Sequence, residues 1–379
     1  MILFIIIFRK KVGDFMNVQI KGSEQISKLL NDWYQVMLQQ QVEKAANLKQ
    51  EIEEKIASIK EDENLLFYYL LLDFRYKLLT DRLSITKDSF DEIESFNRPT
   101  NEITSYYYHF FKAEHALIFG NNNEAREHYE KAETLLKYIP DELEKAEFNQ
   151  KFAVFNHHTS KMLASIQYTN KAKEVFSKHA GYEIKMAACE NTLGTACIFL
   201  KQFEQAEEHL NRAVDILQKY NEERLILVVR HNLGLLYATQ NLSTLAIRHL
   251  SEVTGKIPNH FKANFLQARE HYKLGETSIA QELIERGLKI CSETGNEEYI
   301  YHFNILKALN EGLSINLVEE VVKEGISYFE KEGLWDYVEE YGELLAVEFR
   351  KLNNHEKVSD YFNTCYEAKH KLLSKGALK

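Results

Sequence analysis

Small side chains recur at nearly fixed intervals along most of this chain. Ala125, Ser165, Ala206, Ala246 and Ala280 open similar stretches, separated by steps of 40, 41, 40 and 34 residues. A repeat of two helices and a turn, about 34 residues long, places a small residue where its helices touch. The last step has this length, and longer helices would supply about six further residues in the others. The spacing therefore predicts stacked helix pairs.

Other positions recur in phase with the small residues. Leu-Gly pairs stand at 193–194, 233–234 and 274–275, with their glycines 12, 12 and 5 positions before the small residue, in the segment expected to close the first helix of a pair. A helical bundle with accidental small residues is the alternative, but it would not keep several positions in phase. Only 3 prolines and 15 glycines occur, which favours long helices over sheets rich in turns. Stacked pairs form a superhelix whose concave face suits an extended peptide.

The N-terminal segment predicts three helices joined by short connections. Apolar residues follow helical spacing from Ile26 to Met37, from Ala45 to Ile59 and from Leu65 to Leu79, with Asp62 as the N-cap of the third helix. The predicted fold is all-α: a three-helix bundle at 16–82, a linker with Pro99 at 83–101, and a tetratricopeptide-repeat superhelix of about six to seven repeats at 102–379.

The first residues are apolar up to Phe8 and are followed by Arg9, Lys10 and Lys11. This stretch is far shorter than the roughly 20 apolar residues of a membrane-spanning helix, and its charge order does not fit a signal peptide. Residues 1–15 are therefore interpreted as an upstream extension before Met16, with a membrane anchor as the alternative.

Charge and motifs narrow the classes of function. The formal net charge of −10 disfavours non-specific binding to nucleic acid. The 4 cysteines form no Cys-x-x-Cys pair, which favours a reducing, cytoplasmic compartment. The adjacent histidines His157 and His158 would point about 100° apart on a helix, and no metal, nucleotide or nucleophile-elbow motif occurs. We expect no cofactor, no metal and no membrane partner.

Several segments resemble the Rap family, the response regulator aspartate phosphatases of bacilli and their relatives. The likeness is carried by NDWY at 31–34, DENLLFYY at 62–69, LLDFR at 71–75, YYHFFK at 107–112 and ELEKAEF at 142–148. It covers nearly everything after residue 16 and keeps the order and spacing of the landmarks. The resemblance implies a three-helix bundle joined to a repeat domain.

Two functions follow from the resemblance. Some relatives dephosphorylate the aspartyl-phosphate of a sporulation response regulator, whereas others hold the DNA-binding domain of a competence regulator. Many are switched off by a short signalling peptide, bound inside the superhelix as part of quorum sensing. The chain is thus expected to be either a phosphatase or a non-catalytic sequestering protein. A peptide-sensing transcription factor would need a basic helix-turn-helix of about 60 residues, for which the bundle leaves no room.

The resemblance also places a catalytic position at the start of the third helix. Phosphatase relatives use a glutamine there to orient the attacking water, and this chain has Glu63, preceded by Asp62. A carboxylate can accept a hydrogen bond from the water, but it brings a negative charge towards the phosphoryl group. The simpler interpretation is a first-turn acid that stabilises the helix. Leu66, one turn later, corresponds to a regulator contact or to a core leucine.

For the peptide, the resemblance indicates Asn232, whose amide can both donate to and accept from one peptide unit. Phe199 aligns with a position where many relatives have an acidic residue that binds the basic end of the peptide. A different peptide would follow from this change. Glu298 is the candidate replacement acid.

Overall fold

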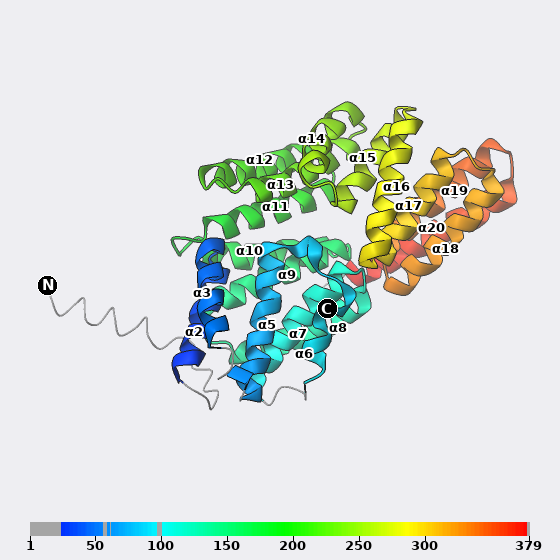
Figure 1. Ribbon diagram of the computed structural model, residues 1–379. Coiled ribbons are helices and arrows are strands. Elements are labelled where there is room, and N and C mark those ends of the chain that lie inside the picture. Colours follow the sequence, from blue (N-terminus) through cyan, green and yellow to red (C-terminus); the bar gives the residue numbers. More distant parts are fainter. Residues whose placement is uncertain (1–23, 56–58, 61, 97–100, 377–379) are drawn as a thin grey trace.

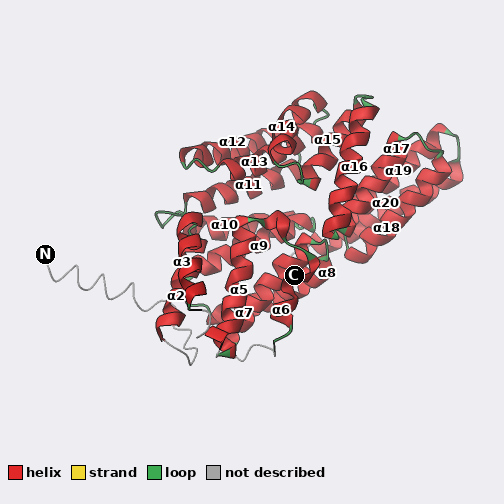
Figure 2. Ribbon diagram, viewed as in Figure 1, coloured by secondary structure: helices red, strands yellow, loops and turns green. Residues whose placement is uncertain are grey.

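The computed structural model describes residues 24–55, 59–60, 62–96 and 101–376, so the interpretation of residues 1–15 lies outside the described part of the chain. Within these ranges the regular structure is helical and contains no strand, as Figure 2 shows. No helix among the described residues is long and apolar enough to cross a bilayer.

The N-terminal bundle consists of α2 (Glu24–Leu38), α3 (Val42–Glu54) and α5 (Glu63–Thr80). Trp33 is fully buried at its centre, where its indole N–H donates to the carbonyl of Ala45 at 2.9 Å. Its ring stacks against Tyr69 with centroids 6.1 Å apart. A buried tryptophan with a satisfied N–H fixes how the three helices meet, because its ring contributes large apolar area in one orientation.

Helix pairs follow the bundle in order. They are α7 (Glu102–Ile118) with α8 (Asn122–Leu135), α9 (Glu142–His158) with α10 (Met162–Phe176), α11 (Glu183–Phe199) with α12 (Phe203–Lys219), α13 (Glu223–Thr239) with α14 (Ser243–Lys256), α15 (Phe261–Lys273) with α16 (Thr277–Thr294), α17 (Glu297–Asn310) with α18 (Ile315–Glu332), and α19 (Trp335–Lys351) with α20 (His355–Gly376). They stack into the arc of Figure 1, and the all-helical superhelix predicted from the repeat spacing is confirmed.

The recurring small residues sit where the helices of a pair touch. All five, from Ala125 to Ala280, have no exposed surface. A Cβ added at Gly194 would lie 2.7 Å from the Cγ of Leu210, and one at Gly234 would lie 2.6 Å from the Cγ of Leu250. The same leucine-into-glycine contact is therefore made in consecutive repeats, which explains why these positions keep their phase.

The Leu-Gly pairs do not all mark the end of the first helix: Gly275 lies in a turn, whereas Gly194 and Gly234 lie within α11 and α13. A residue with positive φ stands five positions before each small residue, but only the first and last of these are glycines. Ser160, Lys201 and Asn241 take the left-handed conformation with φ of 59°, 59° and 57°. This conformation costs a non-glycine residue on the order of 1–2 kcal/mol, which the packed helices on both sides must offset.

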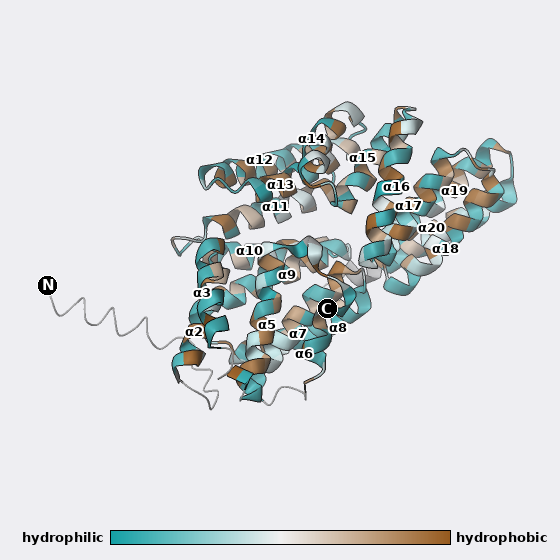
Figure 3. Ribbon diagram, in the orientation of Figure 1, coloured by the Kyte–Doolittle hydropathy of each residue, from teal (hydrophilic) through white to brown (hydrophobic). Residues whose placement is uncertain are grey.

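The linker is part of the core. It forms η1 (Arg82–Ser84), η2 (Lys87–Phe90) and α6 (Asp91–Glu94). Phe90 is fully buried and meets Phe74 of α5 edge to face at 5.0 Å between centroids. One hydrophobic cluster runs without a break from Ile26 in the bundle to Cys189 in α11. The bundle and the first repeats therefore share a core, and Figure 3 shows apolar residues continuing across this junction.

The superhelix also contacts itself over a long sequence separation. Asn296, which caps α17, donates its side-chain N–H to the carbonyl of Ile118 at 2.9 Å. Asn123 donates to the carbonyl of Lys331 at 2.8 Å. The turn of the first pair thus lies against the α17/α18 pair, so the arc closes on itself between these elements.

Candidate functional site

The start of α5 presents the residues expected to meet a response regulator. Asp62 is the N-cap, and its carboxylate accepts hydrogen bonds from the backbone N–H groups of Asn64 at 2.9 Å and Leu65 at 3.2 Å. This use of the Asp62 side chain fixes the position at which the helix begins. Glu63 follows as the first helical residue and is exposed. Leu66 is half-buried against the bundle core, with part of its surface facing outwards.

The inner face of the superhelix is formed by the first helices of the pairs, which touch one another from repeat to repeat. The amide of Asn232 on α13 donates to the side-chain oxygen of Asn191 on α11 at 2.7 Å. On the other side of α13, the ring of His231 lies 5.1 Å from that of His260, the N-cap of α15. Consecutive residues of α13 therefore connect three repeats across the inner face.

The pairing of Asn191 and Asn232 leaves the amide nitrogen of Asn191 and the amide oxygen of Asn232 for a ligand. Within the described residues, the amide nitrogen of Asn191 donates no hydrogen bond and the amide oxygen of Asn232 accepts none. A peptide unit offers the complementary groups, an N–H and a C=O. Asn191 was noted in the sequence only as part of a repeat motif. Its role depends on facing Asn232 across 41 positions of the chain, which helical spacing does not reveal.

The other two peptide-site candidates differ in accessibility. Phe199 is the last residue of α11 and its surface is 45% exposed. Glu298 on α17 is only 2% exposed, and its carboxylate lies 3.2 Å from Nε2 of His158. Burial alone would raise the pKa of Glu298, but His158, Lys262 and His302 lower it to about 2. In this structure Glu298 serves as an internal counter-ion, so it presents no carboxylate to a peptide.

Several titratable side chains lie together on the inner face. This group, here called the inner-face cluster, includes Glu298. Its members are His157 and His158 on α9, His231 on α13, His260 and Lys262 at the start of α15, and Glu298 and His302 on α17. Burial lowers the pKa of His157 and of His260 to about 4, and that of His302 to about 3. These three rings are therefore neutral at pH 7. From the sequence, His157 and His158 were considered only as metal ligands and were rejected in that role, so their place beside Glu298 was not predicted.

A second group, here called the bundle cluster, joins the bundle to the repeats. Glu147 of α9 is fully buried and accepts from Arg75 of α5 at 2.5 Å and from Lys185 of α11 at 2.6 Å. Tyr34 of α2 donates to the same carboxylate at 3.2 Å. Burial would raise the pKa of Glu147, but the two cations lower it to about 2. The bundle is thus held against the superhelix through a neutralised, hydrogen-bonded carboxylate.

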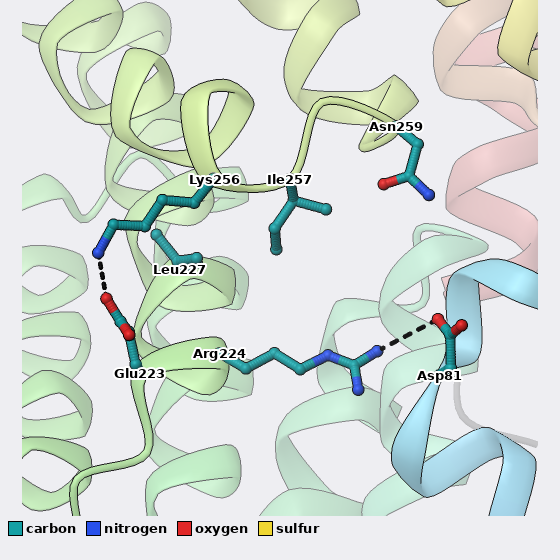
Figure 4. A pocket seen from close by; sticks show the side chains of 7 residues that line it. All are labelled: Asp81, Glu223, Arg224, Leu227, Lys256, Ile257 and Asn259. Carbon is teal, nitrogen blue, oxygen red and sulfur yellow. Dashed lines mark hydrogen bonds and ion pairs between the residues drawn. The ribbon is translucent and has the colours of Figure 1, made fainter.

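The far end of α5 reaches the inner face. Arg224 at the start of α13 donates to the carbonyl of Thr80 and lies 3.9 Å from the carboxylate of Asp81. These groups border a cavity of about 340 Å³, lined also by Glu223, Leu227, Lys256, Ile257 and Asn259 (Figure 4). One helix therefore carries Glu63 at its first turn and touches the inner face at its last.

Comparison with known proteins agrees with this architecture. The profile described as response regulator aspartate phosphatase H, N terminal, matches residues 20–81, and a tetratricopeptide-repeat profile matches residues 185–254. Regulatory protein RapF of Bacillus subtilis is 26% identical over 361 residues, which cover 90% of this chain and 93% of RapF. Response regulator aspartate phosphatase I of the same organism is 26% identical, covering 95% of this chain and 94% of the relative.

The chain belongs to the Rap family. Solved Rap structures also show which arrangement this Rap protein adopts. A Rap protein complexed with Competence and Sporulation Factor superposes with a TM-score of 0.79 at 26% identity, covering 93% of this chain and 99% of the other. The apo form of RapI gives 0.53 at 25% identity, covering 94% and 100%. This Rap protein therefore has its helices arranged more like the complex than like that apo form.

Proposed function

We propose that this Rap protein is a cytoplasmic quorum-sensing regulator that binds a bacterial response regulator through its bundle and hydrolyses the aspartyl-phosphate of that regulator. A short signalling peptide on the inner face of the superhelix ends this activity. The observation that carries the proposal is the exposed acid Glu63 on the first turn of α5, in a bundle that matches the Rap profile.

In this reaction Glu63 positions the attacking water molecule. Its carboxylate accepts a hydrogen bond from a water molecule in line with the phosphoryl group, and the Asp62 cap keeps the first turn of α5 in place. Leu66, one turn along, supplies apolar contact to the regulator. Repulsion between the carboxylate and the phosphoryl group is on the order of 4 kcal/mol at about 4 Å in a dielectric of about 20. A slower reaction than that of a glutamine enzyme follows from this repulsion.

Sequestration without hydrolysis is the second candidate function, and it is favoured by the same residue. A carboxylate at position 63 cannot donate a hydrogen bond to the phosphoryl oxygens, as an amide can. In that case the bundle binds the response regulator, or its DNA-binding domain, and blocks its action without releasing phosphate.

For the peptide, the proposal assigns the backbone contact to the Asn191 and Asn232 amides. Peptide binding is coupled to the bundle through α5, whose last turn is held by Arg224. The greater likeness to the complexed Rap structure supports assigning the present arrangement to the peptide-bound, inactive state. Because Glu298 is paired with His158, we assign it no direct contact with the peptide in that state.

Phosphate release from phosphorylated response regulators of the same cell tests the proposal. The native chain is expected to accelerate release, and Glu63→Gln is expected to accelerate it further because the repulsion is removed. Glu43→Gln, which changes the first-turn acid of α3, is the matched control. Tight regulator binding without release supports sequestration, and absence of any regulator binding rejects both functions.

A further inference from the structure

Three side chains lie at the centre of the inner-face cluster. His231, His260 and Lys262 each keep part of their surface exposed. Even so, burial is the largest cause of the lowered pKa in all three. They stand on α13 and at the start of α15, two of the first helices that form the concave inner face of the superhelix. The cavity lined by Arg224 and Leu227 (Figure 4) lies nearer the start of the same helix, α13.

Lys262 has no carboxylate within ion-pair distance among the described residues. Its Nζ lies over the ring of Tyr299 at 5.2 Å from the centroid. Glu298 is the carboxylate that raises the pKa of Lys262. Its oxygen, however, lies 3.2 Å from Nε2 of His158. An ammonium group that is surrounded by protein without a paired carboxylate is unfavourable in the empty protein.

A second permanent cation, Arg82, acts on Lys262 and makes its charged form less favourable. Arg82, at the end of the bundle, lies 3.5 Å from Glu114, which also has Lys151 at 3.2 Å. Arg82 is therefore paired with a carboxylate of its own, whereas Lys262 is not.

Several histidine rings of the inner-face cluster have nitrogen atoms without partners. Nε2 of His157, Nδ1 of His231 and Nε2 of His302 are buried and make no hydrogen bond within the described residues. His302 as a whole is only 2% exposed. Buried polar atoms in folded proteins are nearly always paired, so these unpaired nitrogens add to the unfavourable free energy of the cluster around Lys262.

We propose that the signalling peptide is bound through a carboxylate, which Lys262 pairs with while His231 and His260 contact it from α13 and α15. The Asn191 and Asn232 amides hold the peptide backbone on the other side of α13. The ligand is therefore a peptide that offers a carboxylate to Lys262, from an acidic side chain or from its free C-terminus. This inference rests on the peptide-binding part of the proposed function and adds the charge of the ligand to it.

The test uses a randomised pentapeptide pool, made once with free C-termini and once with amidated C-termini. The full chain is incubated with each pool, separated by gel filtration, and the retained peptides are identified by mass spectrometry. Loss of retention in the amidated pool assigns the carboxylate to the C-terminus. Enrichment of Asp or Glu in both pools assigns it to a side chain.

Variants of Lys262 complete the experiment. Lys262→Gln is expected to weaken binding of a retained peptide by roughly 30-fold, the cost of removing one partner of a desolvated charge pair. Lys262→Arg is expected to restore most of it. Lys289→Gln, at a highly exposed lysine of α16, is the matched control and is expected to bind like the native chain. The melting temperature of Lys262→Met is expected to be unchanged or higher, whereas a purely structural lysine would lower it on removal.

Three results would overturn the inference: no retained peptide, retained peptides without preference for a carboxylate, or unchanged binding by Lys262→Gln. Regulator binding by the bundle is measured separately. A chain that selects acidic peptides but binds no regulator would reject the proposed function and leave this inference standing.

Discussion

The bundle cluster and the inner-face cluster are both buried groups of charges, but they differ in how completely the charges are paired. In the bundle cluster, Glu147 is bonded to two cations and a tyrosine hydroxyl. In the inner-face cluster, Lys262 lies over the ring of Tyr299, and the carboxylate of Glu298 lies against His158. A paired cluster holds two parts of a fold together, whereas an incompletely paired one stores an unfavourable free energy that a ligand can relieve.

The largest expected effect comes from breaking the paired cluster. Glu147→Gln leaves Arg75 and Lys185 buried without their carboxylate, and it should lower the free energy of unfolding by about 3–5 kcal/mol. Urea unfolding measures the loss. Glu142→Gln is the control, since Glu142 lies on the same helix with its side chain 63% exposed and pairs with His179. Similar small losses for both variants would contradict the distinction between the clusters.

The Asn191–Asn232 pair, next to the inner-face cluster on α13, predicts a loss of binding without a loss of stability. Asn232→Ala should weaken the affinity for a retained peptide about tenfold or more, because one hydrogen-bonding amide contributes about 1–3 kcal/mol when its partner is left buried. Isothermal titration calorimetry measures the affinity. Asn191→Ala should have a comparable effect, and Asn363→Ala on exposed α20 should have none. Unchanged peptide affinity in Asn232→Ala would reject the assigned backbone contact.

The histidines of the inner-face cluster predict a dependence of stability on pH. Burial lowers the pKa of His302 from 6.5 to about 3, so between these values the unfolded chain binds a proton that the folded chain does not. Stability present above pH 6.5 is therefore lost as the pH falls towards 3, at about 1.4 kcal/mol per pH unit for one proton. His302→Phe should reduce the slope of unfolding free energy against pH by that amount. His355→Gln, at an exposed histidine, controls for the loss of a histidine in general.

The smallest effect is expected at an exposed ion pair that joins the linker to α17. Lys87 and Glu297 lie 3.2 Å apart, and their side chains are 53% and 58% exposed. Solvent screens such a pair, so Glu297→Gln should change the unfolding free energy by less than about 1 kcal/mol. The difference should vanish in concentrated salt. A loss as large as that in Glu147→Gln would show that burial does not separate these interactions.

The sequence predicted where the candidate regulator-binding residues lie on their helix. It did not predict the exposure or the partners of the peptide-site residues. An N-cap is a local signal, so Asp62 and the exposed Glu63 could be placed on the first turn of α5 from their neighbours alone. Glu298 sits in an ordinary first turn, and nothing near it in sequence indicates that His158, 140 positions earlier, lies 3.2 Å from its carboxylate. The left-handed turns at Ser160 and Lys201 were missed, because serine and lysine give no local signal for a positive φ.

The sequence by itself determined the helices, their pairing and the small residues at their contacts, because helical spacing and steric fit act over a few residues and repeat along the chain. Tertiary structure alone decided which charges are paired. The closing of the arc brings α9, α13, α15 and α17 together on the inner face, and the docking of α5 places Arg75 on Glu147. Electrostatic free energy depends on distance and burial across such contacts, and neither is encoded in local spacing.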